Sequence, residues 1–257
     1  MERSGEYAEN YTIGEMMVTT AAKELRDGEL VFAGIGIPTL ATLLAKYTVA
    51  PRLSIVVESG CIAPQPRRLI MSVGDNACAE RAVCLTTLYT VFSDQQRGLY
   101  DVGVVSGAQV DKYGNLNSTC IGDYEKPTVR FTGSGGANDI ASSVGRTLIL
   151  MRLERRRFVK NLDFLTSPGY LEGYDSRRKA GLTGGGPSAV ITDKCVFRFD
   201  PVTKEMYLDA LYPRVSVEDV VGEVSWKLKV PEKVKTAPPL TVREVELIRM
   251  LDPLGLY

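Results

Sequence analysis

The sequence contains no histidine among its 257 residues, and this absence narrows the chemistry that the protein can use. Histidine is the side chain that most often acts as a general base near neutral pH, and it is a common metal ligand. Its absence excludes Ser-His-Asp and Cys-His triads and the HExxH zinc site. We therefore expect no metal centre, and any catalysis must use other groups.

Cysteines are also few, and their arrangement indicates whether the protein belongs to an oxidising or a reducing cellular compartment. The five cysteines are odd in number and scattered, and no two form a C-x-x-C pair, which argues against a disulfide framework and against a zinc knuckle. Residues 1–6 do not include the apolar stretch of a signal peptide. Both observations lead us to expect a cytoplasmic protein. The cysteines are Cys61, Cys78, Cys84, Cys120 and Cys195.

The chain lacks an excess of either charge and lacks a long apolar run. Its 31 Lys+Arg balance 31 Asp+Glu, so no net field attracts a polyanion, and we expect no nucleic-acid partner. The longest uncharged run, residues 30–45, is broken by Gly34, Gly36 and Pro38 and is shorter than the roughly 20 residues that span a bilayer. We therefore expect no membrane span and small molecules or proteins as partners.

Periodicity in the first 60 residues predicts a strand–helix–strand unit. Residues 12–15, Thr-Ile-Gly-Glu, form a capping box that begins a helix ending near residues 27–28. Apolar strands are predicted at 30–33 and 53–57, and between them a Gly-rich turn leads into a helix that tolerates Pro38 in its first turn. Such a unit implies parallel pairing and a ligand crevice at the carboxyl ends of the strands.

The rest of the chain extends this pattern and then changes it. Further strands are expected at 101–106 and 148–151, a turn at 111–115, and an antiparallel meander after about residue 180. We predict an α/β fold with an open, mostly parallel sheet flanked by helices, antiparallel strands in the C-terminal third, and residues 1–257 as a single domain. The meander strands are expected at 189–192, 196–199 and 206–211, helices at 216 onward and 241–251, and an extended connection at 227–239.

The Gly-rich turn after the first strand is one candidate for a functional loop. Gly34 and Gly36 match the beginning of a dinucleotide fingerprint, but Thr39 replaces its third small residue and Pro38 removes an amide donor. Three alternatives remain open: the turn binds a nucleotide, the glycines serve the turn alone, or the turn shapes a neighbouring active site.

Glu58 is the second candidate, because it directly follows an apolar strand and precedes Ser59-Gly60. Burying a lone carboxylate costs several kcal/mol unless it is paired or hydrogen-bonded. Glu58 is therefore either a structural ion-pair partner, for example of Arg67 or Arg68, or a nucleophile or general base in the crevice.

The third candidate is the loop Gly133-Ser134-Gly135-Gly136-Ala137-Asn138-Asp139. Its small residues can present consecutive backbone amides to an oxyanion or a phosphate, although many Gly-rich loops are only turns.

Together these motifs resemble those of the β subunits of family I coenzyme A transferases, with the glutaconate branch as the nearest pattern. The resemblance rests on the Gly-Ile-Gly-Ile-Pro turn, the strand-terminal Glu-Ser-Gly and the Gly-Ser-Gly-Gly-Ala-x-Asp loop, and it covers nearly the whole chain. Further matching runs are Gly107-Ala108-Gln109-Val110-Asp111, Tyr113-Gly114-Asn115-Leu116-Asn117-Ser118-Thr119, Ile121-Gly122-Asp123-Tyr124, Arg130-Phe131-Thr132, Arg155-Arg156-Arg157-Phe158, Thr166-Ser167-Pro168-Gly169 and Val190-Ile191-Thr192-Asp193-Lys194.

The resemblance implies a ping-pong CoA-transferase in which Glu58 is the nucleophile and carries CoA as a glutamyl thioester. It assigns Gly135, Gly136 and Ala137 to the loop that lines the acyl pocket and oxyanion site, and it leaves Gly34 and Gly36 as a turn that shapes the pocket. Coenzyme A is then a substrate and covalent intermediate, with no permanently bound cofactor. Because Glu-Ser-Gly matches the glutaconate branch, a dicarboxylic acyl group is favoured.

The resemblance also implies a homologous α subunit, in a dimer of heterodimers or a larger assembly, that completes the pocket for acyl-CoA and carboxylic acid. Two alternatives are kept. In one, the protein is an acyl-CoA or ring-opening hydrolase with Glu58 as base, and in the other it is a non-catalytic CoA-binding or regulatory partner. Arg155, Arg156 and Arg157 are either contacts for CoA phosphates or the partner, or a solvated basic face.

Overall fold

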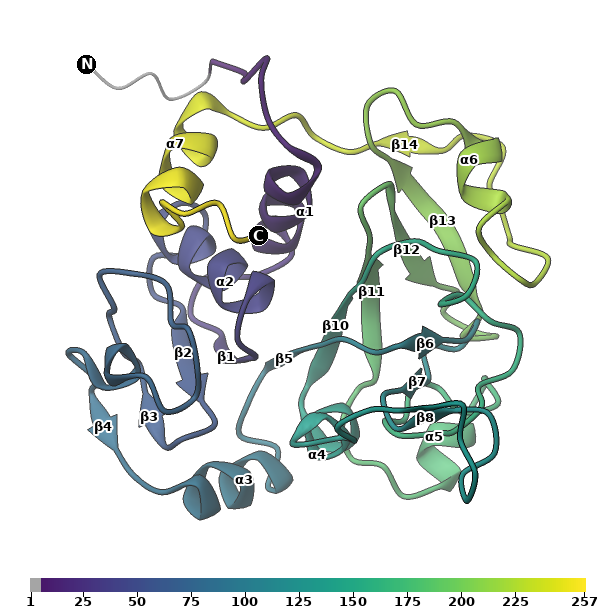
Figure 1. The fold of residues 1–257 in the computed structure, drawn as a ribbon, viewed down its shortest axis with the longest axis horizontal. Helices are drawn as coiled ribbons and strands as arrows, with labels where there is room; N and C mark the ends of the chain where they lie inside the picture. The colour runs from purple at the N-terminus through teal and green to yellow at the C-terminus, as the bar shows by residue number, and fades with distance from the viewer. Residues whose placement is uncertain (1–5) are drawn as a thin grey trace. The chain divides into compact units, whose positions relative to one another are not determined.

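The predicted capping box begins the first helix of the protein (Figure 1). The computed structural model describes residues 6–257, so residues 1–5, on which the signal-peptide expectation partly rests, lie outside the described residues. Helix α1 (Ile13–Lys23) is capped at Thr12, whose hydroxyl accepts from the Glu15 amide at 3.0 Å. The Glu15 carboxylate in turn accepts from the Thr12 amide at 2.7 Å, which completes the box.

The strand–helix–strand unit is confirmed and sets the edge at which the site lies. Strand β1 (Leu30–Ala33) is followed by α2 (Ile37–Tyr47) and β2 (Ser54–Val57). β1 pairs in parallel with β2, with Phe32 opposite Val56, and in parallel with β5 (Val102–Val105) on its other side. Pro38 lies in the first turn of α2, where its missing N–H has no helical partner to lose.

Beyond β2 the chain forms elements that the sequence did not predict. β2 turns back into β3 (Cys61–Ile62), which pairs antiparallel with β2 and with β4 (Cys84–Leu85). A short 3-10 helix (Asn76–Ala79) and helix α3 (Leu88–Gln96) flank β4. The strands β3 and β4 have two residues each, which is too short to show a period-2 pattern in the sequence.

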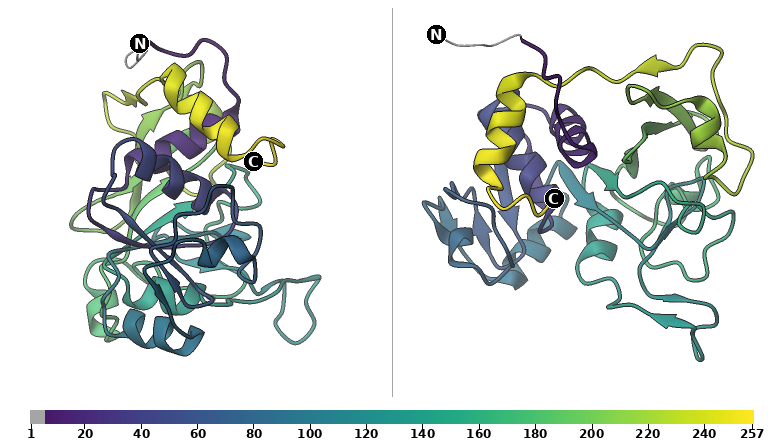
Figure 2. Two further views of the ribbon diagram at one scale, coloured as in Figure 1. Left: turned by 90° about the vertical axis from the view of Figure 1, so that its left-hand side faces the viewer. Right: turned by 45° about the horizontal axis from the view of Figure 1, so that its top comes forward.

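Helix α7 (Val242–Leu251), near the C-terminus, packs with the two N-terminal helices. Figure 2 shows α7 beside the purple helices in both views. The Arg249 guanidinium pairs with the buried Glu15 carboxylate at 2.7 Å, which links α7 to α1. The expected C-terminal helix is therefore confirmed, and it covers α1 and α2.

The chain divides into two compact units: one formed by residues up to Val104 together with Pro238–Tyr257, and a second formed by Val105–Ala237. In the first unit the strands pair in the order β5-β1-β2-β3-β4. The single-domain expectation stays a prediction. None of the helices in residues 6–257 is long and apolar enough to cross a membrane.

In the second unit, the expected change to antiparallel pairing is confirmed. β10 (Arg146–Leu150) and β11 (Pro187–Ile191) are parallel, whereas β11, β12 (Cys195–Phe199) and β13 (Met206–Leu211) form the antiparallel meander. The predicted connection at 227–239 contains one short strand, β14 (Lys235–Thr236), parallel to β13. The other elements are β6 (Gln109–Val110), β7 (Leu116–Asn117), β8 (Cys120–Ile121), β9 (Val129–Arg130), α4 (Ala137–Ser143), α5 (Ser176–Lys179) and α6 (Val217–Val221).

The α/β class with parallel strands and antiparallel strands in the C-terminal third is thus confirmed.

Candidate functional site

Glu58 lies where β2 ends, at the same sheet edge as the Gly34–Gly36 turn. Because Phe32 is opposite Val56 in parallel strands, the chain leaves β1 and β2 at one edge, into Gly34 and Glu58 respectively. The carboxyl edge of parallel strands is where α/β proteins place ligands. The structure therefore brings together two of the three predicted features.

A three-residue loop presents Glu58 between two antiparallel strands. Val57 is opposite Cys61, so Glu58, Ser59 and Gly60 form the loop of the β2–β3 hairpin. Gly60 has φ +105°, a backbone conformation that favours glycine, and its amide donates to the Val57 carbonyl at 3.0 Å. The sequence Glu-Ser-Gly is thus also the local sequence that closes the hairpin.

Gly60 also ties this loop to the segment before α3. The Thr86 amide donates to the Gly60 carbonyl at 2.8 Å, and a Cβ atom on Gly60 would lie 2.7 Å from the Thr86 carbonyl carbon. Thr87, the next residue, caps α3 by accepting from the Thr90 amide at 3.2 Å. The backbone that carries Glu58 is therefore fixed by a close approach that only glycine permits.

The carboxylate of Glu58 is half-buried and is unpartnered among the residues that the structure describes. The ion-pair alternative is not realised, because Arg67 pairs with Glu80 at 3.4 Å and Arg68 pairs with Asp75 at 2.6 Å. A carboxylate held on a fixed loop without a structural partner is available to react or to bind.

The Gly34–Gly36 turn is built by internal hydrogen bonds. The Thr39 hydroxyl donates to the Gly34 carbonyl at 2.6 Å, and Gly36, with φ +94°, caps α2. A Cβ atom on Gly36 would lie 3.2 Å from the Tyr257 ring. Thr39, which departs from the dinucleotide fingerprint, thus closes the turn itself.

The Gly135–Ala137 loop belongs to the second unit, so its relation to Glu58 stays a prediction. The Ala137 amide donates to the Ser134 carbonyl at 2.9 Å and is therefore engaged. Within residues 6–257, the amides of Gly135 and Gly136 donate to no acceptor. These two amides are the better candidates for oxyanion donors, and a Cβ on Gly135 would meet nothing within 4 Å.

Arg177, which the sequence did not single out, holds the far end of helix α4. It is buried, and its guanidinium donates to the carbonyls of Ala141 at 2.7 Å and Ser142 at 3.0 Å in α4. It also donates to the carbonyls of Gly169 and Gly184 at 2.9 and 2.8 Å. A cation at a helix C-terminus satisfies carbonyls that lack helical partners. Arg177 thus positions the helix that follows the Gly135–Ala137 loop.

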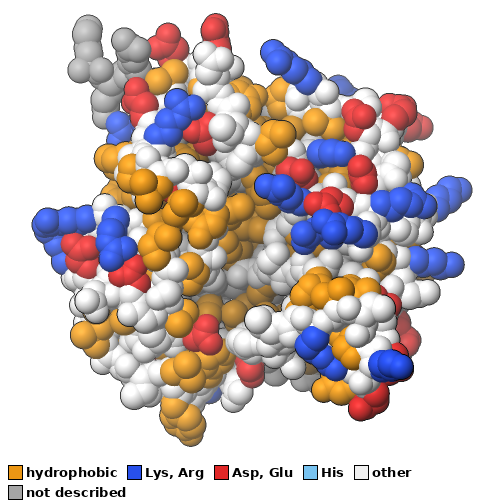
Figure 3. Space-filling model, in the orientation of Figure 1, with side chains coloured by type: hydrophobic (Ala, Val, Ile, Leu, Met, Phe, Trp, Pro, Cys, Tyr) orange, Lys and Arg blue, Asp and Glu red, His pale blue; other side chains and the backbone are white. Residues whose placement is uncertain are grey.

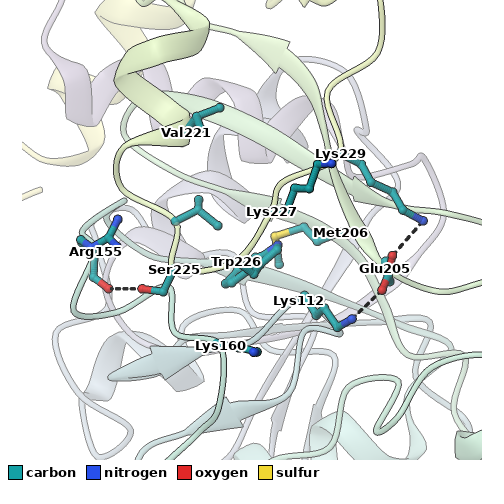
Figure 4. A pocket seen from close by; sticks show the side chains of 11 residues that line it. Lys112, Arg155, Lys160, Glu205, Met206, Val221, Ser225, Trp226, Lys227 and Lys229 are labelled. Carbon is teal, nitrogen blue, oxygen red and sulfur yellow. Dashed lines mark hydrogen bonds and ion pairs between the residues drawn. The ribbon is translucent and has the colours of Figure 1, made fainter.

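Two cavities of the second unit are lined by none of Gly34, Gly36, Glu58 and Gly135–Ala137, whereas Arg155, a candidate contact for CoA phosphates, lines one of them. One of about 690 Å³ is lined by Lys112, Arg155, Glu205 and Trp226, among others (Figure 4), and one of about 980 Å³ lies beside Asp111 and Tyr113. The single tryptophan in a Lys-rich segment is the sequence signal that could have pointed to the first cavity. No group of three or more His, Cys, Asp or Glu in residues 6–257 could hold a metal ion.

Comparison with known proteins adds to this geometry. The family model described as "Coenzyme A transferase" matches residues 14–223. The chain is 40% identical over 243 residues to the B subunit of the 3-oxoadipate CoA-transferase of Pseudomonas knackmussii, covering 94% of each chain. It is 41% identical over 251 residues to the B subunit of the glutaconate CoA-transferase of Acidaminococcus fermentans, covering 95% of this chain and 94% of that one.

The fold agrees with a solved structure. The crystal structure of glutaconate coenzyme A-transferase from Acidaminococcus fermentans superposes with a TM-score of 0.91 at 38% identity, and the match covers 98% of each chain. The resemblance inferred from the motifs is thus confirmed at the level of sequence family and fold.

Proposed function

The chain belongs to the coenzyme A transferase family as a B-type subunit, and we propose that it moves CoA between an acyl-CoA and a free dicarboxylic acid through a glutamyl-CoA thioester on Glu58. The observation that carries this proposal is the Glu58 carboxylate: half-buried, at the ligand edge of a parallel sheet, and unpartnered among the described residues. A carboxylate is ionised at neutral pH and needs no base to activate it, which suits a chain without histidine.

In the proposed first half-reaction, a Glu58 carboxylate oxygen attacks the thioester carbonyl of the acyl-CoA. The tetrahedral intermediate collapses, the C–S bond breaks, and CoA leaves as a thiolate from an acyl-glutamyl anhydride. The thiolate then attacks the glutamyl carbonyl, which releases the acid as a carboxylate and leaves the Glu58–CoA thioester. The acceptor carboxylate repeats these steps in reverse. No proton is transferred, and each bond broken is replaced by one formed.

The amides of Gly135 and Gly136 are the proposed donors to the oxygen of the tetrahedral intermediates. Their lack of other acceptors among the described residues supports this role, and amides of this kind contribute about 10² to 10³ in rate. We propose that Gly34 and Gly36 shape the wall of the same pocket.

We further propose a homologous α subunit that completes the pocket in a hetero-oligomer. Two relatives are named as B subunits of CoA-transferases, which supports a partner of this kind. The position of Glu58 on a hairpin loop, half-buried and unpartnered among the described residues, also supports a site that a second chain closes. Glutaconate and 3-oxoadipate, the acids in those names, are both dicarboxylic, which supports the proposed substrate class.

The test is to incubate the two-subunit complex with a panel of acyl-CoAs without acceptor, reduce it with borohydride, and map the peptides by mass spectrometry. We expect reduction of Glu58 to the alcohol, and the acyl-CoA that labels it identifies the substrate class. CoA release from an unmodified Glu58 would instead indicate hydrolysis with Glu58 as base.

The matched variants are Glu58→Gln and Glu80→Gln. The first removes the nucleophile with a nearly isosteric amide and should abolish transfer at an unchanged melting temperature. The second removes a carboxylate of the same unit that is engaged by Arg67, and it should leave transfer unchanged. Transfer by the Glu58→Gln complex would end the proposal.

A further inference from the structure

The cavity of about 690 Å³ in the second unit is lined mainly by cationic side chains, whereas the predicted site is built around the carboxylate of Glu58. Lys and Arg side chains gather on the part of the surface that this unit forms, the right-hand part of Figure 3. Five cationic side chains line the cavity, together with a single carboxylate, that of Glu205. The cations are Lys112, Arg155, Lys160, Lys227 and Lys229.

Glu205 neutralises only part of this charge. Its two carboxylate oxygens pair with Lys112 at 2.5 Å and Lys229 at 2.8 Å. These pairs lower the pKa of Glu205, so the carboxylate remains ionised near neutral pH. Figure 4 shows Glu205 between the two lysines at one side of the cavity.

The remaining three cations have no carboxylate partner for their side chains among residues 6–257. The Arg155 guanidinium donates to the Gly222 carbonyl at 3.0 Å, and the ammonium groups of Lys160 and Lys227 have neither a hydrogen bond nor an ion pair there. Like charges around one concavity repel each other, so the cavity is poised to take an anion.

Trp226 gives the cavity a flat apolar surface as well. It packs on Phe158 with ring centroids 6.3 Å apart and an angle of 26° between the rings, and in Figure 4 it lies at the centre of the lining side chains. Met206 and Val224 extend this apolar surface. Indole rings stack with planar heterocycles, and Lys and Arg bind phosphate. A volume of 690 Å³ lies within the range of pockets for small molecules.

From this combination we propose that the cavity is a binding site for a nucleoside phosphate, with the base against Trp226 and the phosphates on Lys160, Lys227 and Arg155. The site is built from residues separate from Glu58, and only the coenzyme A source named below rests on the proposed function. Two sources carry the same chemical group: the nucleotide end of a coenzyme A molecule, or a free nucleotide. The experiment distinguishes them.

Trp226 is the only tryptophan of the chain and serves as the probe. The two-subunit complex is titrated with adenosine 3′,5′-bisphosphate, and the change in tryptophan fluorescence is recorded. The same titration of the Trp226→Phe complex is the control, because any change that it shows comes from tryptophans of the partner subunit. We expect saturable quenching that is absent in Trp226→Phe. Adenosine without phosphate should bind at least tenfold more weakly.

Charge variants test the assignment of the cations. Lys160→Ala and Lys227→Ala should each weaken binding by up to about fivefold, as expected for exposed charges, and Glu205→Gln should strengthen it by removing the one carboxylate of the lining. Lys126→Ala, an exposed lysine outside the cavity, should leave binding unchanged. Melting temperatures of all variants confirm that they fold.

Two results together would identify the nucleotide end of the acyl-CoA substrate as the occupant. Coenzyme A would compete with the bisphosphate, and the KM for acyl-CoA in Lys227→Ala would rise by the same factor as the bisphosphate affinity falls. Bisphosphate binding that persists at saturating coenzyme A would identify a free nucleotide. Absence of saturable quenching at millimolar bisphosphate, or equal effects of the Lys126, Lys160 and Lys227 variants, would overturn the proposal.

Discussion

Gly60 approaches Thr86 so closely that a Cβ atom on the glycine would lie 2.7 Å from the Thr86 carbonyl carbon. This approach, together with the hydrogen bond from the Thr86 amide, sets the position of the loop that carries Glu58. The glycine of Glu-Ser-Gly therefore has a packing role in addition to its turn role.

Gly60→Ala should lower the free energy of unfolding by about 3 kcal/mol or more, because it combines an unfavourable φ with a backbone clash. The matched control is Gly98→Ala, which also has a positive φ, +76°, but meets nothing within 4 Å. The control should cost only roughly 1 kcal/mol. Chemical denaturation of both variants decides this, and equal losses would contradict the role of the close approach.

Gly136→Val should reduce CoA transfer by about 10²-fold with a small change in melting temperature, because the side chain would intrude on the proposed oxyanion loop. Gly136 has φ −79°, so valine meets no strain from a positive φ. Gly74→Val is the control, since Gly74 is exposed, has no positive φ, and a Cβ there would meet only the Ser72 hydroxyl at 4.0 Å. If activity and stability fell in parallel, the loop would be only a turn.

Arg177→Lys should destabilise the protein by about 3 kcal/mol, because several buried carbonyls lose a charged donor. Arg178→Lys is the neighbouring control: Arg178 is exposed and pairs with Asp175 at the surface, so its replacement should change stability by no more than about 0.5 kcal/mol. Urea unfolding measures both. A stable Arg177→Lys variant would show that water or rearrangement satisfies these carbonyls.

The pKa of the Asp75 carboxyl makes the stability of the folded protein depend on pH. The Arg68 guanidinium, aided by the amides of Ala77 and Met71, holds the pKa of the Asp75 carboxyl well below its ordinary value of 3.8. Because the pKa is lowered on folding, this carboxylate stabilises the folded state above about pH 4, and the contribution is lost as the pH falls toward the lowered pKa. The difference in melting temperature between wild type and Asp75→Asn should therefore be present at pH 7 and shrink below pH 4. A difference that did not vary with pH would contradict this.

The single-domain prediction has its own test in calorimetry. We expect residues 1–257 to unfold in one transition with equal calorimetric and van't Hoff enthalpies. Two separate transitions would show instead that the two compact units unfold independently.

The elements whose signals are local can be predicted from the amino-acid sequence. The Thr12–Glu15 capping box, the apolar strands around a Gly-rich turn, and the C-terminal meander follow from hydrogen-bonding side chains and periodicity, which neighbouring residues carry. The location of Glu58 at a strand end was predictable for the same reason. The family was also readable from ordered motifs spread over the chain.

The choice between the alternatives left open for a residue depended on the packing of distant segments. Arg67 and Arg68 pair with Glu80 and Asp75, so Glu58 is left unpartnered among the described residues, and no sequence spacing fixes that choice. The cationic cavity around Trp226 unites segments from residues 112 to 229, which meet only when the second unit folds. Such contacts depend on the packing of distant segments, and periodicity and capping patterns do not encode them.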